Sequence, residues 1–303
     1  MPRLDPEKPL SRSVPELATF HLEAAITLLE EQRNGPHHAV HQARKSLKRL
    51  RALLRLVESA DRKVLRAVRR NVSDAARHMS EFRDSTALVE CAERLHVYLE
   101  ARHAGDMSAP LREAVERRRD LLALETPASE KLVAPVIVAC RKALKDIAGA
   151  SFGRDDDAAS IVAAGRQKNH DKARAILEAC HHGGQPEAFH DLRKAAQTTL
   201  FQAGFLSDLW PFAFDAEANS AKSLTEVLGH EHDIEVLAHL LQSEPHLFGA
   251  IADKDRLASL LMERRAALRH DAMTVAADLY RQSGRKEAKR LVALWRLASG
   301  KRA

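Results

Sequence analysis

The chain is poor in aromatic residues, glycine, proline and cysteine. Aromatic side chains make up 4% of its 303 residues, and it has 12 glycines, 11 prolines and three cysteines. A composition dominated by Ala and aliphatic residues, with few chain-breaking residues, is typical of an all-α protein. The cysteines form no Cys-x-x-Cys pair and fall within apolar helical patterns. We therefore expect buried free thiols in a reducing compartment.

Long apolar runs and catalytic motifs are also missing. No apolar run approaches the roughly 20 residues that a membrane-spanning helix needs, and the polar, Pro-rich N-terminus has no hydrophobic signal core. We therefore expect a cytoplasmic protein with no membrane partner. The chain lacks Walker A, Gly-x-Gly-x-x-Gly and Gly-x-Ser-x-Gly motifs and any acidic cluster spaced for Mg²⁺. We therefore expect no enzyme activity, no cofactor and no metal.

One helical segment contains no acidic residue at all. Between His41 and Val57 the sequence reads HQARKSLKRLRALLRLV. On a helix one stripe is cationic, with Lys45 beside it, and we expect the apolar residues to lie on the opposite side. The stripe consists of His41, Arg44, Lys48, Arg51 and Arg55, and the apolar seam of Ala43, Leu47, Leu50, Leu54 and Val57.

Like charges one turn apart cost a few tenths of a kcal/mol each, and nothing within the segment relieves them. The net charge of +6 also favours anionic partners. A polyanion is therefore the natural counterpart of the stripe, and a solvated surface face is the alternative.

The pattern along the chain predicts a flexible arm over residues 1–15 and one domain over 16–300. Within it we expect lobe one at about 16–148, a linker at about 149–158 and lobe two at about 159–299; residues 149–157 of the linker read GASFGRDDD. Apolar periodicity and turn residues predict helices at about 15–33, 36–59, 63–83, 84–102, 111–124, 129–148, 159–179, 187–207, 216–228, 233–242, 252–282 and 285–299.

The second half of the chain repeats the first. His41-x-x-Arg44-Lys45 recurs as His190-x-x-Arg193-Lys194 at an offset of 149 positions (190 − 41 = 149). The same offset, without a gap, relates further residues, and this register indicates two homologous helical lobes. The further pairs are His21 and His170, Leu28 and Leu177, Gly35 and Gly184, Ala39 and Ala188, Asp84 and Asp233, and Leu88 and Leu237.

These motifs resemble a known family, the CHAD domain (conserved histidine α-helical domain), over about residues 17–298. His41-x-x-Arg44-x3-Lys48-Arg49-x-Arg51 is similar to the family's first histidine motif, and His190-x-x-Arg193 stands where its second would be. The second motif is degraded. Where the family continues Lys-x-x-Arg-Tyr, this chain has Gln197, Leu200 and Phe201. Leu224-x3-Leu228-Gly229-x3-Asp233 looks like the family's helix junction, and Arg83-Asp84 like its first-lobe partner.

The resemblance implies a fold and a ligand. CHAD domains are two four-helix-bundle lobes related by a pseudo-twofold axis, whose basic helices line a central groove. The groove binds inorganic polyphosphate, and the family is linked to polyphosphate granules. The residue pattern independently favours such a partner, because Arg forks and Lys point charges spaced one turn apart suit a linear polyanion. We therefore expect non-catalytic binding of inorganic polyphosphate or another polyanion.

The candidate binding residues are the cations and histidines of both lobes. His41 and His190 either donate to phosphate, better when protonated, or brace their helix starts; both interpretations stay open. The set comprises His41, Arg44, Lys45, Lys48, Arg49, Arg51, Arg55, Arg66, Arg69, Arg70, Arg117, Arg118, His190, Arg193, Lys194, Lys222, Arg264, Arg265, Lys286 and Lys289.

Two other functions remain open. The same basic surface suits RNA or another nucleic acid, although single-strand readers interleave aromatic residues with cations and the basic stripes have none. A metal-dependent phosphohydrolase would use His230, His232 and Asp233. Histidines two apart on a helix point to different faces, so we favour a helix junction there, with Asp233 as the N-cap of the second helix.

Overall fold

Every regular element in the described part of the chain is a helix, as the composition predicts. The computed structural model describes residues 2–77, 79, 81–125, 130–154, 157–182 and 186–300, without the side chains of 81–86, 123–125, 130–132 and 186. The expected features at Arg83-Asp84, Thr126-Pro127, Asp155-Asp156 and Gly183-Gly184 fall outside these described residues or side chains.

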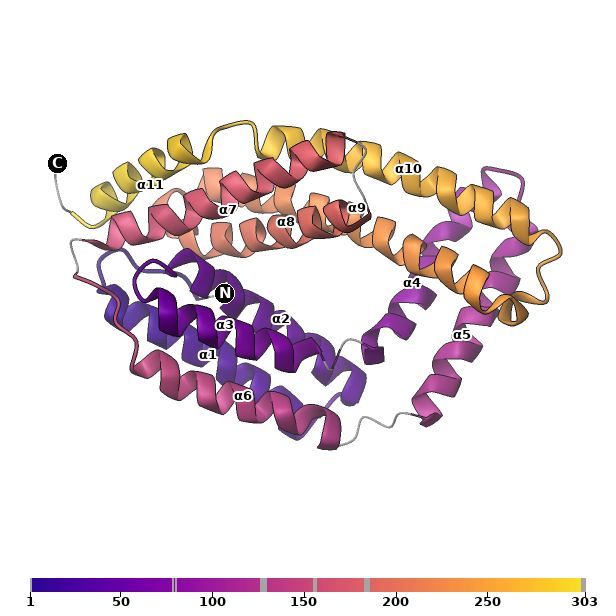
Figure 1. The fold of residues 1–303 in the computed structure, drawn as a ribbon, viewed down its shortest axis with the longest axis horizontal. Coiled ribbons are helices and arrows are strands. Elements are labelled where there is room, and N and C mark those ends of the chain that lie inside the picture. The colour runs from indigo at the N-terminus through magenta and orange to yellow at the C-terminus, as the bar shows by residue number, and fades with distance from the viewer. Residues whose placement is uncertain are drawn as a thin grey trace. The chain divides into compact units, whose positions relative to one another are not determined.

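The first half of the chain supplies four helices that pack together: α1 (Leu10–Glu31), α2 (Pro36–Leu56), α3 (Arg62–Arg77) and α6 (Glu130–Ala148). They run side by side in Figure 1. The predicted turn at Asn34-Gly35-Pro36 is confirmed. Gly35 has a φ of 84°, in the region that favours glycine, and Pro36 opens α2 at the position where its missing N–H costs no helical bond.

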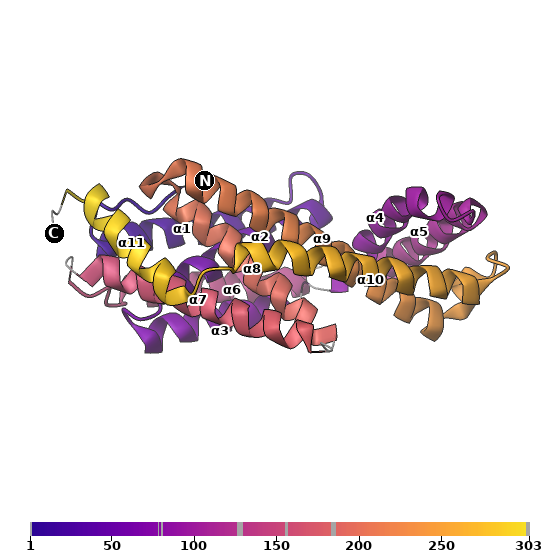
Figure 2. The same cartoon turned by 90° about the horizontal axis from the view of Figure 1, so that it is seen from above.

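The second half supplies α7 (Ala158–His181), α8 (Pro186–Leu206), α9 (Pro211–Ser243), α10 (Lys254–Leu279) and α11 (Gly284–Ala298). Helix α11 packs along α7, as Figures 1 and 2 show, and α7 packs on α8. The bounds of α7 and α8 equal those of α1 and α2 shifted by 149, to within one residue.

The predicted helix junction near Gly229 was wrong. Helix α9 is continuous over 33 residues, and Asp233 lies in its interior instead of capping a new helix. Glycine in a helix costs only about 1 kcal/mol relative to alanine. The buried leucines on this helix, Leu224 and Leu228 before the glycine and Leu237 after it, outweigh that cost.

The chain divides into two compact units, each with helices from both halves. Unit 1 comprises residues 1–79, 130–225 and 275–303, and unit 2 comprises 80–129 and 226–274. Unit 2 contains α4 (Glu81–Glu100) packed on α5 (Ser108–Glu125), with the remaining parts of α9 and α10. Its core joins residues of all four helices, among them Leu95, Leu111, Leu237 and Leu261.

The N-terminal segment is packed within unit 1, and regular structure begins earlier than expected. Helix α1 begins at Leu10 instead of Pro15. Leu4 is fully buried, and its backbone N–H donates to the carbonyl of Phe205 at 2.9 Å. Arg3 forms an ion pair with Asp208. The described part of residues 1–15 is therefore held by the end of α8.

All three cysteines are buried and free, as predicted. Of the helices in the described ranges, none combines the length and apolar character that crossing a bilayer requires.

Candidate functional site

Helix α2, which carries the acid-free stripe, packs on two sides. The predicted seam of Ala43, Leu47, Leu50, Leu54 and Val57 is buried, as expected. Ala52 and Leu56, on the far side of the stripe, are buried as well. The reason is that α2 contacts α1 and α3 of the first half and also α7 and α8 of the second. The predicted seam is therefore confirmed, and the stripe runs between it and a second buried surface.

The two helices that carry the repeated His-x-x-Arg motif lie against each other. Arg55 of α2 donates from Nη1 to Thr198 Oγ1 of α8 at 2.8 Å. Gln202 of α8 donates in return to the Ala52 carbonyl at 3.4 Å. The Arg49 guanidinium lies 5.8 Å from the centre of the Phe201 ring, within cation–π range. Phe201, one of the departures from the family pattern, thus has a role in holding α8 to α2.

A pocket of about 160 Å³ opens beside this contact, within unit 1. Cationic side chains enter it from four helices, and both halves of the chain contribute. The lining residues are Arg55 of α2, Glu58 just after it, Arg69 of α3, Gly165, Lys168, Asn169 and Lys172 of α7, and Lys194 and Ala195 of α8.

Glu58 is the one carboxylate among the lining residues. It is 5% exposed and accepts hydrogen bonds from Lys168 Nζ at 2.7 Å and from Arg69 Nη2 at 3.0 Å. Burial alone would raise the pKa of Glu58, but Lys168 and Arg69 outweigh it and hold the pKa below its ordinary value. Glu58 therefore stays ionised at neutral pH and joins the first half of the chain to the second.

The guanidinium groups beside the pocket are crowded. Burial and the like charges of Arg69 and Arg51, partly offset by Glu58, together lower the pKa of Arg55 to about 10. Burial and Arg69 also lower the pKa of Arg51. Both groups remain charged at neutral pH, so the local field is positive and incompletely compensated. An anion entering the pocket would relieve this repulsion.

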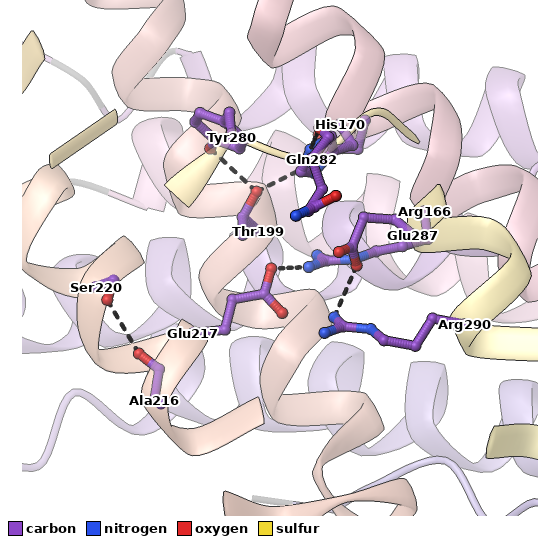
Figure 3. A network of polar contacts seen from close by, with 11 residues as sticks. Arg166, His170, Thr199, Ala216, Glu217, Ser220, Tyr280, Gln282, Glu287 and Arg290 are labelled. Carbon is purple, nitrogen blue, oxygen red and sulfur yellow. Dashed lines mark hydrogen bonds and ion pairs between the residues drawn. The ribbon is translucent and has the colours of Figure 1, made fainter. Parts of the chain in front are cut away.

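A buried polar network extends from the pocket into the core of unit 1. Asn169 donates to Thr199 Oγ1 at 3.0 Å, and Thr199 shares a hydrogen bond of 3.1 Å with the Tyr280 hydroxyl. His170 binds the Gln282 carbonyl at 2.7 Å through Nε2. Figure 3 shows Thr199 of α8 and Tyr280, in the turn after α10, directed toward each other, with His170 of α7 beside Gln282. Asn169, which lines the pocket, is thereby held to Thr199 of α8.

Arg166 lies in the same region without reaching the pocket. It is 1% exposed and pairs with Glu217, while Glu287 pairs with Arg290 at 2.8 Å (Figure 3). Burial lowers the pKa of Arg166. This arginine was not predicted, and its pairing indicates a structural role.

Only three of the predicted cations line the pocket: Arg55, Arg69 and Lys194. Arg44 donates to the Ala76 carbonyl at 2.9 Å and ties α2 to α3. His41 and Lys45 are exposed, and Lys48 is partly buried. The pocket does not bring His41 and His190 together. Elsewhere in unit 1, His190 and Arg193 are partly buried, and the exposed candidates are Arg66, Arg70, Lys222, Lys286 and Lys289.

Most of the predicted cations of unit 2 pair with carboxylates, and one lies near an aromatic ring. Arg265 bonds Glu231 at 2.8 Å, and Arg118 bonds Glu244 at 3.1 Å. Arg264 lies 5.4 Å from the centre of the Tyr98 ring. Arg117 is exposed, 3.9 Å from Glu113. An anion would have to compete with these partners.

Two of the residues that the phosphohydrolase alternative would use, His230 and Asp233, lie beside arginine side chains. Asp233 accepts from Arg94 at 2.7 Å. Burial, with Arg94 and Arg264 nearby, lowers the pKa of His230 to about 4. Among the residues that the structure describes, no three His, Cys, Asp or Glu side chains come close enough to hold a metal ion.

Sequence reasoning missed Glu58, Lys168 and Lys172. The repeat did not point to either lysine, because the residues 149 positions before Lys168 and Lys172 are Thr19 and Glu23. A signal was nevertheless present, because Lys168 and Lys172 are one turn apart on the same face of α7.

No curated protein matches the chain closely enough to assign it. The family model of the CHAD domain matches residues 16–242. That match covers most of the chain, including both histidine motifs, the four helices that form the pocket and Glu58. The chain therefore belongs to the CHAD domain family.

Proposed function

We propose that the protein binds inorganic polyphosphate without converting it, and that the pocket of unit 1 is part of the binding surface. The observation that carries the proposal is the convergence of Arg55, Arg69, Lys168, Lys172 and Lys194 from both halves of the chain. Membership of the CHAD family supports the same ligand.

The chemistry of the lining residues fits phosphoryl oxygens. Arginine forks donate two parallel hydrogen bonds to an oxyanion, while lysines on the rim supply mobile point charges. Lys194 is 55% exposed at its side chain, and its pairing with Asp191 at 3.0 Å is a weak surface interaction that a polyanion can replace.

In this proposal the wider basic surface continues the path of the polymer. The two halves of the chain form pseudo-symmetric lobes around a basic groove, the polymer follows the exposed cations of α2 and α3, and the protein resides in the cytoplasm at polyphosphate granules. His41, exposed at the start of the stripe, strengthens binding when it is protonated.

Nucleic acid is the second candidate ligand, since its phosphates attract the same cations. Among the described residues that line the pocket, none is aromatic, so base stacking would contribute little there. This favours bare phosphates over bases.

The test is competition binding with labelled long-chain polyphosphate. The double variant Lys172→Ala/Lys194→Ala removes two exposed rim lysines, and we expect roughly tenfold or greater weakening at moderate salt. Lys142→Ala/Lys145→Ala on α6 is the matched control, because it removes the same charge from residues that do not line the pocket. Equal weakening of both variants, or RNA competing as well as polyphosphate, would contradict the proposal.

Catalysis is tested separately. The protein is incubated with polyphosphate and Mg²⁺ or Mn²⁺, and released phosphate is measured. We expect none above the level without protein. Release that is lost in Asp233→Asn would support the phosphohydrolase alternative instead.

A further inference from the structure

The pocket is closed on one side by backbone. Gly165 of α7, a lining residue, lies so close to α2 that a Cβ on it would stand 2.7 Å from the Cα of Leu56. No side chain or ligand fits between the two helices there. A polymer entering the pocket therefore cannot leave past Gly165.

The size of the pocket limits what enters. Its volume of about 160 Å³ corresponds to about five water molecules at ~30 Å³ each. A phosphoryl group with its oxygens is larger than one water molecule. The pocket thus has room for a few phosphoryl groups and not for a long chain.

The charge of the pocket matches a chain end better than a chain middle. Five cations line the pocket together with the carboxylate of Glu58, and a second carboxylate, Asp191, pairs with Lys194. An internal phosphoryl group of a polyphosphate carries one negative charge, whereas a terminal group ionises a second time, as a phosphate monoester does with a second pKa of about 6. The terminal group therefore gains more from the same cations.

Arg69 is the more enclosed donor. Its side chain is 19% exposed and bonds Glu58 through Nη2 at 3.0 Å, which leaves other N–H groups of the guanidinium to donate to a phosphoryl oxygen. Lys168 and Lys172, by contrast, are exposed at the rim, where the following part of a chain would pass.

We propose that this pocket binds the terminal phosphoryl group of a linear polyphosphate, with Arg55 and Arg69 around the end group and the chain leaving past the exposed Lys168, Lys172 and Lys194. This inference rests on the proposed function. The protein then recognises chain ends. As a result, the affinity per phosphoryl group is highest for short linear chains and lowest for rings.

The test compares linear tripolyphosphate with cyclic tetrametaphosphate, which carries a similar total charge at neutral pH and has no end. Affinities are measured by calorimetry, with orthophosphate and sulfate as further competitors. We expect the linear compound to bind roughly tenfold more tightly than the ring, the effect of about one additional charge-assisted hydrogen bond. Orthophosphate binding as tightly as tripolyphosphate would mean a site for the free ion, and would overturn the chain-end proposal.

Two variants test which residues cause the difference in affinity between the linear and the cyclic compound. Arg69→Gln should bring linear and cyclic affinities to within a factor of about three of each other. Because Arg69 also pairs with Glu58, the exposed Lys172→Ala provides a second variant in which folding is not at issue, and it should weaken the linear compound more than the ring. Lys142→Ala on α6 should change neither.

The outcomes separate the two proposals. Equal affinity of linear and cyclic compounds, with long-chain polyphosphate still bound, would overturn end recognition alone. Failure to bind long-chain polyphosphate at all would overturn the proposed function as well.

Discussion

Gly165 of α7 lies directly against the backbone of Leu56 at the end of α2, and a Cβ on Gly165 would overlap the Leu56 carbonyl oxygen. These two residues come from opposite halves of the chain. Their contact sets the distance between α2 and α7, and with it the spacing of Arg55 from Lys168 across the pocket.

Gly165→Ala should therefore destabilise the protein. The added methyl group has no space, and forcing the helices apart costs roughly 1–3 kcal/mol. Thermal denaturation followed by circular dichroism should show a lower midpoint. Gly149→Ala is the control, because a Cβ there meets only atoms at 3.9 Å. An unchanged midpoint for Gly165→Ala would mean that the helices do not meet as described.

Glu58→Gln should tighten binding of polyphosphate. The carboxylate competes with incoming anions for Arg69 and Lys168, and removing its charge while keeping its shape leaves both cations available. We expect roughly tenfold higher affinity, equivalent to about 1.4 kcal/mol. Calorimetric titration of the variant beside the wild type measures it. Weaker binding would show that Glu58 serves mainly to position the two cations.

His21 should make stability depend on pH. It is fully buried between Phe20 and Phe205, and burial, reinforced by Arg49, lowers its pKa from 6.5 to about 4. Between these pH values the unfolded chain binds the proton and the folded protein does not. The stabilisation is therefore complete above pH 6.5 and is lost as the pH falls toward 4, by roughly 3 kcal/mol in total.

Urea denaturation across pH 4–7 measures this effect. His21→Leu should flatten the pH dependence relative to the wild type, while the same change at the exposed His38 should leave it intact. Parallel curves for the wild type and His21→Leu would contradict the assignment.

Glu231→Gln should destabilise unit 2. Glu231 is 2% exposed and accepts from Arg265 at 2.8 Å and from Arg269 at 2.7 Å. Removing its charge takes from the two partly buried guanidinium groups the carboxylate that they share, while Arg265 keeps its pair with Glu235 at 2.5 Å, and we expect a cost of roughly 2–3 kcal/mol. Glu263→Gln, in an exposed pair with Arg102, should cost under about 1 kcal/mol by the same denaturation assay. Similar costs for the two variants would rule out this difference in burial as the cause.

The helices and most of their ends were predictable, because turn residues such as Asn34-Gly35-Pro36 act locally. The continuity of α9 was not. The sequence around Gly229 predicted a break. The helix continues because residues of its second part, such as Ile234 and Leu237, are buried in the core of unit 2.

The cationic character of the candidate site was predictable from the sequence, but most of the residues that line it were not. The acid-free run marked α2 as an anion-facing helix, and Arg55 does line the pocket. Periodicity on one helix, however, cannot say which cations of other helices approach it. Lys168 and Lys172 enter the site through the close approach at Gly165, which depends on the tertiary packing of α7 on α2. Glu58 lies one residue beyond the run, where the chain turns from α2 into the pocket wall.

The salt dependence of polyphosphate binding tests the central claim most directly. For polyanions, each cation that replaces a counterion adds roughly 0.7–0.9 to the slope of log affinity against log salt. We predict a steep slope for the wild type, and a decrease of about one for Arg69→Ala in the first half of the chain and for Lys172→Ala in the second. We predict no decrease for Lys142→Ala. A shallow wild-type slope, or one that Arg69→Ala and Lys172→Ala leave unchanged, would contradict the account.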